Sequence, residues 1–118
     1  MTQHDPVVTV RQMIDCVTDA VRLSHGKSLA ALDEDQVLTL ALTRLVEVAG
    51  EAANRLPTEM RMRYSEIPWR EMIGMRNVLI HGYDIASVDI LHAVVTQDLP
   101  RVLPRLEQML VALSGDSP

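Results

Sequence analysis

Four side chains able to do chemistry lie close together in the sequence: Arg76, Asn77, His81 and Tyr83. Cleavage of an RNA phosphodiester needs one group to take the proton of the 2′-OH and another to protonate the departing 5′-oxygen. It also needs a cation to stabilise the charge that develops on the phosphate. Histidine suits the proton transfers because its ordinary pKa is about 6.5, and arginine offers phosphate a planar fork that stays protonated. The segment therefore contains the residue types that phosphodiester cleavage requires.

The spacing of these residues limits how they can meet. On an unbroken helix, Arg76 and Tyr83 share a face, whereas His81 lies about 140° away from Arg76 at about 100° per residue. Either the backbone turns at Gly82, where glycine tolerates an unusual conformation, or a second copy of the chain completes the site. The bare spacing also fits a structural role, in which the Arg and His cap a helix end and the Tyr packs.

The elements that position this motif are all expected to be helices, because no segment shows the alternation typical of a strand. Helices are expected over 7–24, 35–56, from Pro68 to near His81, 88–97 and 102–113. The connectors are 28–35 and 57–67, and each has room for a short helical turn. A kink or a restart of the helix is expected at 98–100. Ser87 is expected to cap the helix over 88–97. The fold prediction is an all-α, four- to five-helix up-and-down bundle. It forms one domain over 1–118, with frayed ends at 1–6 and 114–118.

The long helix over 35–56 carries both an apolar and a polar stripe. The apolar stripe is expected to contain Leu38, Ala41, Leu42, Leu45, Ala49, Ala52 and Leu56. The polar stripe contains Thr43, Glu47, Gly50, Glu51 and Asn54. It is either a solvated face, with Glu47 paired to Arg44 or Arg55, or a seam against a site or partner. On the second interpretation Glu47 is a supporting residue of the site.

The composition restricts the class of protein. The chain has 118 residues, one Trp, two Tyr and no Phe, so it lacks the aromatic platforms on which many single-strand binders stack bases. Its net charge of −5 argues against electrostatic coating of nucleic acid. Residues 55–76, however, hold five Arg and three Glu, and this net positive stretch leads directly into the motif.

Other titratable residues fit structural roles. Cys16 is the single cysteine, which excludes an intramolecular disulfide, and a buried inert thiol is expected. His92 is expected to be packed or at an interface, and the acidic run over 33–35 to start a helix. No metal or cofactor is expected. No signal peptide or membrane span is evident, and a cytoplasmic location is the simplest interpretation.

The motif Arg76-x4-His81-x-Tyr83 resembles that of the HepT toxins in the HEPN superfamily of ribonucleases. The resemblance extends over 69–83, including Gly74-Met75-Arg76-Asn77, and over 46–53, Val-Glu-Val-Ala-Gly-Glu-Ala-Ala. It also includes the turn Asp98-Leu99-Pro100. About 100 of the 118 residues fit in order. Gly82 is a departure, since many members have a larger residue between the His and the Tyr.

The resemblance implies an all-α homodimer whose two motifs face a shared cleft. It implies a metal-independent endoribonuclease toxin of a type VII-like toxin–antitoxin module, with Arg76 and His81 catalytic and Asn77 supporting. It further implies a minimal nucleotidyltransferase (MNT) antitoxin that transfers AMP to Tyr83, which would add negative charge and bulk beside the phosphate site.

Two other functions fit the chain less well. One is a non-catalytic helical subunit that binds substrate for a minimal nucleotidyltransferase, against which the Arg/His pair argues. The other is a DNA-binding regulator, against which the acidic composition and the lack of a basic recognition helix argue.

Overall fold

The computed structural model describes residues 5–80 and 85–115, apart from the side chains of 76–80 and 85–87. Almost all of this part of the chain is helical, and none of it forms a strand. The elements are α1 (Pro6–Ser24), α2 (Leu29–Glu34), α3 (Gln36–Arg55), α4 (Thr58–Arg63), α5 (Trp69–Ile80), α6 (Ile85–Ala93), the π-helix η1 (Val94–Asp98) and α7 (Leu99–Gly115). The predicted all-α class is confirmed. No helix in these ranges has both the length and the apolar character needed to cross a bilayer.

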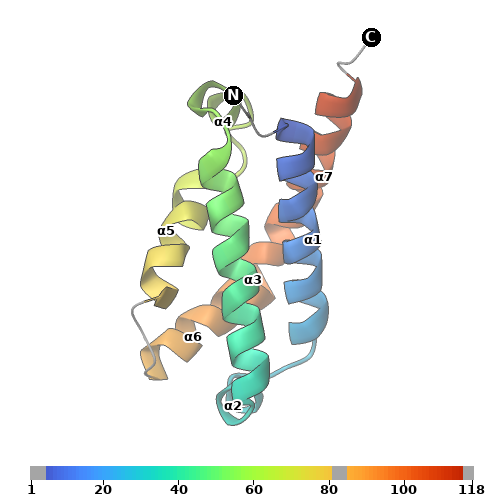
Figure 1. The fold of residues 1–118 in the computed structure, drawn as a ribbon. Helices are drawn as coiled ribbons and strands as arrows, with labels where there is room; N and C mark the ends of the chain where they lie inside the picture. Colours follow the sequence, from blue (N-terminus) through green and yellow to red (C-terminus); the bar gives the residue numbers. More distant parts are fainter. Residues whose placement is uncertain (1–4, 81–84, 116–118) are drawn as a thin grey trace.

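The long helices alternate in direction (Figure 1). Helices α1 and α3 are antiparallel neighbours, α5 runs back along α3, and the continuous α6–η1–α7 segment returns so that α7 packs beside α1. The two short helices join them at opposite ends of the bundle, α2 at the end where α3 begins and α4 at the end where α3 finishes. This is the predicted up-and-down bundle, with the connectors over 28–35 and 57–67 each containing one short helix.

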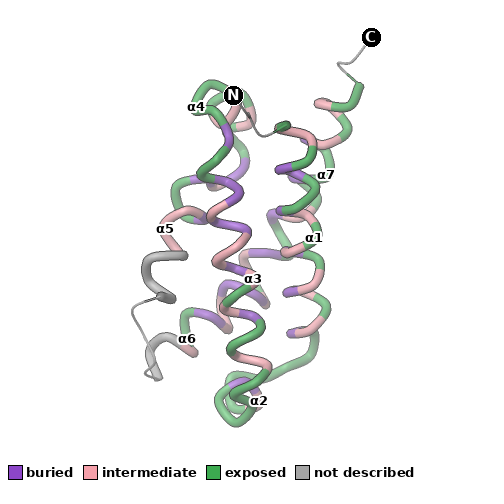
Figure 2. The backbone as a smooth tube through the Cα atoms, viewed as in Figure 1, coloured by how far each residue is buried: buried purple, intermediate pink, exposed green. Residues whose placement is uncertain are grey.

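Aliphatic side chains from α1, α3 and α7 fill the centre, where Figure 2 shows the buried positions turned toward one another. The buried residues of these helices include Val10, Met13, Val17, Leu42, Val46, Ala49, Ala53, Val102, Leu106 and Met109. The predicted stripe on α3 was wrong at three positions: Ala41, which it included, is exposed, and Val46 and Ala53, which it left out, are buried. The reason is that α3 packs against both α1 and α5, so its buried arc is wider than one stripe.

Side-chain caps determine where the N-terminal helices begin. The carboxylates of Asp5 and Asp35 accept hydrogen bonds from the backbone N–H groups of Val7 at 2.9 Å and Leu38 at 3.0 Å. These bonds satisfy donors that have no partner within the helix. The predicted role of the acidic run over 33–35 as a helix start is therefore confirmed for Asp35 alone, because Asp33 and Glu34 are the last residues of α2. At the other end of α1, Gly26 adopts a φ of 74°, which glycine accepts readily.

The last helical segment departs from its prediction. Ser87 does not cap a helix, because α6 already begins at Ile85. The interruption predicted at 98–100 lies earlier, as the π-helix over 94–98, and α7 already begins at Leu99, whose N–H donates to the carbonyl of Val94, five residues back. The wider turn suits Pro100, which has no N–H to donate.

This π-helix is tied to α1 by a buried serine. Ser24 is 1% exposed, and its hydroxyl lies 2.7 Å from the Ala20 carbonyl and 3.4 Å from the Val95 carbonyl. In a regular helix the Val95 carbonyl would accept a hydrogen bond from the Leu99 N–H. Here the Leu99 N–H donates to the Val94 carbonyl instead. The serine hydroxyl donates mainly to Ala20, so the displaced carbonyl receives only the longer branch of a shared hydrogen bond.

Candidate functional site

Helix α5 carries the first half of the predicted motif. The backbone is helical at Arg76 and Asn77 and remains so to Ile80. His81 and Tyr83, like the predicted helix end at Gly82, lie outside the described residues. The two arrangements that could bring Arg76 and His81 together therefore both stay predictions.

The start of α5 is anchored in the core, which fixes the direction of the motif helix. Trp69 is 8% exposed, and its indole N–H donates to the Tyr64 carbonyl at 3.0 Å. Met72 is also buried, and its N–H donates to the Pro68 carbonyl at 3.0 Å. Pro68 thus stands immediately before the first helical residue, within one position of its prediction.

Helix α3 places its polar stripe beside α5. Asn54, near the end of α3, lines the same groove as Ile73 and Gly74 of α5. Glu47 lies seven residues earlier on the same face of α3, about 10 Å away along the axis. Because α3 and α5 are antiparallel neighbours, positions earlier than Asn54 on α3 lie beside later positions of α5, the direction in which the motif follows.

Both interpretations of Glu47 find support in its surroundings. Its carboxylate pairs with Arg44 at 3.4 Å, as the solvated interpretation predicted, but the Glu47 side chain is only 19% exposed while Arg44 is 66% exposed. Arg55, the other predicted partner, donates instead to the Gln12 side chain of α1. Glu47 is therefore a half-buried carboxylate on the α5 side of the bundle.

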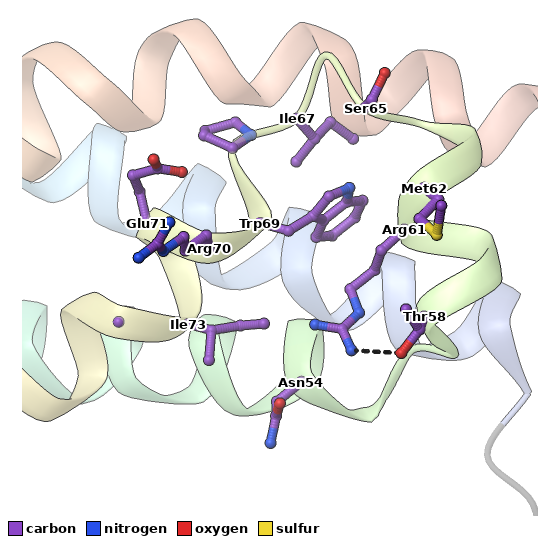
Figure 3. A pocket seen from close by; sticks show the side chains of 12 residues that line it. Asn54, Thr58, Arg61, Met62, Ser65, Ile67, Trp69, Arg70, Glu71 and Ile73 are labelled. Atoms are coloured by element: carbon purple, nitrogen blue, oxygen red, sulfur yellow. Dashed lines mark hydrogen bonds between the residues drawn. The ribbon is translucent and has the colours of Figure 1, made fainter.

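A groove of about 640 Å³ lies beside the start of α5, between α4 and the end of α3 (Figure 3). Its lining includes the cations Arg61 and Arg70, the carboxylate Glu71 and the polar side chains of Asn54, Thr58 and Ser65. The only sign of this groove in the sequence is the net positive charge of residues 55–76. The groove itself could not be predicted, because the separation of α3, α4 and α5 depends on tertiary packing. Its residues were not among the predicted site residues.

Arg61 has an unusual environment within this groove. One Nη donates to the hydroxyl of Thr58 at 3.3 Å. Its Nε is buried and, among the described residues, has no hydrogen-bond partner. Figure 3 shows the side chain extending from α4 toward Thr58 and Asn54, past the indole of Trp69. A buried donor without an acceptor costs about 1–3 kcal/mol, so such atoms call for an explanation.

The remaining candidates behave as structural residues. Cys16 is half-buried, less enclosed than predicted, and burial raises the pKa of its thiol, with the nearby Asp15 and Asp19 adding to the rise. The Nε2 of His92 lies 2.9 Å from the Lys27 carbonyl, which ties α6 to the end of α1 and confirms a packed histidine. Within residues 5–80 and 85–115, no three His, Cys, Asp or Glu side chains cluster so that they could hold a metal ion.

Several curated proteins are similar to this chain. It is 35% identical to "Putative RNase TTE0752" of Caldanaerobacter subterraneus subsp. tengcongensis over 72% of this chain and 76% of the relative. It is 36% identical to "Probable ribonuclease HepT" of Thermococcus cleftensis over 64% of this chain and 68% of the relative. A third relative, "Putative RNase MJ1380" of Methanocaldococcus jannaschii, is 24% identical over 91% of this chain and 98% of its own length.

No solved structure matches the chain significantly. The sequence profile of the family described as Ribonuclease HepT-like matches residues 13–109, which include most of α1, the whole of α3 and α5, and the motif over 76–83. With its all-α bundle and its similarity to these relatives, the chain belongs to the HepT-like family of HEPN-type ribonucleases.

Proposed function

We propose that this protein is a metal-independent endoribonuclease toxin that cleaves RNA with Arg76 and His81. The family match over 13–109 carries the proposal, because it spans the whole Arg76-x4-His81-x-Tyr83 motif. The relatives named as ribonucleases support an activity on RNA. The positive stretch over 55–76, on an otherwise acidic chain, supports a polyanionic substrate.

Each residue of the proposed site has a separate task. His81 is the general acid/base of the proton transfers, for which a group with an ordinary pKa near neutral pH is suited. Arg76 binds the scissile phosphate and stabilises its growing negative charge. Asn77 supports the site by hydrogen bonding. Glu47, half-buried on the neighbouring helix, supports the cations of the site electrostatically.

A homodimer would bring two copies of the motif to one cleft. Mixing the inactive variants Arg76→Ala and His81→Ala tests whether Arg76 and His81 of one active site come from the same protomer or from opposite protomers. If Arg and His of opposite protomers act together, the mixed dimer regains one intact site, up to about a quarter of wild-type activity after random exchange. If the pair comes from one protomer, mixing restores no activity.

Light scattering on the purified protein tests whether it is a dimer, and a monomer that cleaves RNA at full rate would contradict the proposed homodimer.

Regulation is proposed to act at Tyr83. A minimal nucleotidyltransferase antitoxin would transfer AMP from ATP to the phenolic oxygen, which gives up its proton as pyrophosphate leaves, placing a phosphate and a bulky base beside the phosphate site. Intact mass after co-expression with such an enzyme should increase by whole AMP units that map to Tyr83. No increase, or an increase that persists in Tyr83→Phe, would contradict this mechanism.

Growth of a host that expresses the chain without an antitoxin tests the toxin activity. Wild-type protein should arrest growth, and Arg76→Ala should abolish the arrest. Arg101→Ala is the matched control, because Arg101 is exposed on α7 and outside the motif. Equal growth of the wild type and Arg76→Ala at equal protein levels would favour the non-catalytic subunit instead.

A further inference from the structure

We infer that the groove between α4 and α5 is a binding subsite for single-stranded RNA, which holds the strand next to the cleaved bond. This inference rests on the proposed ribonuclease function. It adds binding residues outside the motif, chiefly Arg61 and Arg70, with Gly74 keeping the groove open.

Position is the first observation that supports the subsite. Arg70 and Gly74 line the groove and lie on the same helix as Arg76. Six residues of helix separate Arg70 from Arg76, about 9 Å along the axis and about 120° around it, so a strand that contacts both must also pass partly around α5. By helical periodicity, position 77 continues the face on which Arg70 and Gly74 stand. The groove face therefore continues along α5 to position 77, next to Arg76 in the sequence.

The chemistry of the lining is the second observation. Two guanidinium groups border the groove against the single carboxylate of Glu71. Asn54, Thr58 and Ser65 add neutral groups that can donate to phosphate or sugar oxygens. A volume of about 640 Å³ lies within the range of about 300–1,000 Å³ found for small-ligand pockets, which accommodates a nucleotide.

Arg61 provides the third observation. Its guanidinium is held on one side by Thr58, while its buried Nε has no partner among the described residues. A phosphate in the groove would supply acceptors to the guanidinium, and a small rotation of the side chain would bring Nε to the same anion. Binding would thereby satisfy a donor that the unbound protein leaves unpaired.

Gly74 provides the fourth observation. A Cβ added at this position meets no atom of the described neighbours within 4 Å, so the backbone of α5 faces open space there. Glycine in a helix interior lowers stability by about 1 kcal/mol relative to alanine. Close approach of a strand to this backbone gives the residue a function that compensates for that loss.

The test measures RNA affinity separately from cleavage. Fluorescence anisotropy with a labelled single-stranded RNA of about twelve nucleotides, in the His81→Ala background, gives a Kd without substrate turnover. Arg61→Ala and Arg70→Ala should each raise this Kd roughly three- to tenfold. Each should also reduce the steepness of the salt dependence by about 0.7, the value for one lost phosphate contact on a single strand.

Matched variants separate the groove from general electrostatics. Arg63→Ala removes the same charge from an exposed position on α4 that does not line the groove. Because salt screens a distant surface charge, this variant should change Kd by less than about twofold. Gly74→Leu keeps every charge and clashes with no protein atom at Cβ, yet it should weaken binding by filling the groove. Thermal unfolding of each variant checks that the fold is intact.

The outcomes distinguish the two proposals. If the folded groove variants bind this RNA as tightly as Arg63→Ala does, the subsite is wrong, whatever other partner the groove accepts. If the groove variants lose affinity but the wild-type protein cleaves no RNA, the subsite stands as an RNA-binding surface and the ribonuclease proposal fails.

Discussion

The two sides of α3 differ in kind. Toward α1 and α7 it meets a dry aliphatic core in which Leu42, Leu106 and Met13 are fully buried. Toward α4 and α5 it borders a charged groove that Asn54 lines, and seven residues earlier it carries a half-buried carboxylate, Glu47. The same helix therefore stabilises the fold on one side and presents polar groups on the other. Variants on the two sides should change different measured quantities.

The largest expected effect is on stability and comes from the core. Leu42→Ala should lower the free energy of unfolding by about 2–5 kcal/mol, because it removes buried methyl groups and leaves a cavity. Leu40→Ala is the control two residues away, where the side chain is 50% exposed, and it should cost less than about 0.5 kcal/mol. Denaturant titration measures both. Equal losses in the two variants would contradict the assignment of the core face.

A smaller loss is expected at the start of α3. Asp35→Ala removes the acceptor for the Leu38 N–H and should destabilise by about 0.5–2 kcal/mol. Asp35→Asn keeps a capping oxygen and should recover most of the loss. Asp33→Ala removes an equal charge from an exposed position in α2 and is the electrostatic control. If Asp33→Ala costs as much as Asp35→Ala, charge and not capping explains the effect.

Two glycines should respond in opposite directions to alanine. Gly74→Ala should stabilise by up to about 1 kcal/mol, because the position is helical and a Cβ there meets no neighbour. Gly26→Ala should destabilise by about 1–2 kcal/mol, because its φ of 74° is unfavourable for a residue with a Cβ. Both positions have open space, so the sign depends only on the backbone. Melting temperatures that shift in the same direction would contradict this explanation.

The smallest effect concerns the thiol of Cys16, whose pKa is raised above its ordinary value, first by burial and then by Asp15 and Asp19. The folded state favours the protonated thiol, so its contribution to stability is present below the ordinary pKa and is lost as pH rises through the raised value. Alkylation by iodoacetamide at pH 8 should be slower in the folded protein than in urea. Faster alkylation of the folded protein would indicate an activated thiol.

Much of the fold could be predicted from the sequence because its signals are local. The spacing of apolar residues in α1, the capping carboxylate of Asp35 and the stop at Pro57 all act within a few residues. Ser87 was assigned wrongly because it is a good capping residue in a segment where the helix had already begun. The π-helix depends on Pro100 together with Ser24, which are far apart in the sequence, so local patterns predicted an interruption but not its form.

The candidate site also has one part that could be predicted from the sequence and one part that could not. Arg76, Asn77, His81 and Tyr83 could be proposed because they are adjacent in the sequence. The groove could not, since Asn54, Arg61 and Arg70 come from three helices whose separation is set by packing. The sequence indicated only that the stretch over 55–76 is positively charged.

The central claim is cleavage of RNA by Arg76 and His81, and the rate of cleavage by purified, antitoxin-free protein tests it most directly. The measurement follows a labelled single-stranded RNA in excess EDTA, with His81→Ala and Arg76→Ala beside the wild type and the exposed His25→Ala as the matched control. Wild type and His25→Ala should cleave equally, and the two motif variants should be slower by at least about a hundredfold. Cleavage by His81→Ala at the wild-type rate, or none by the wild type, would contradict the claim.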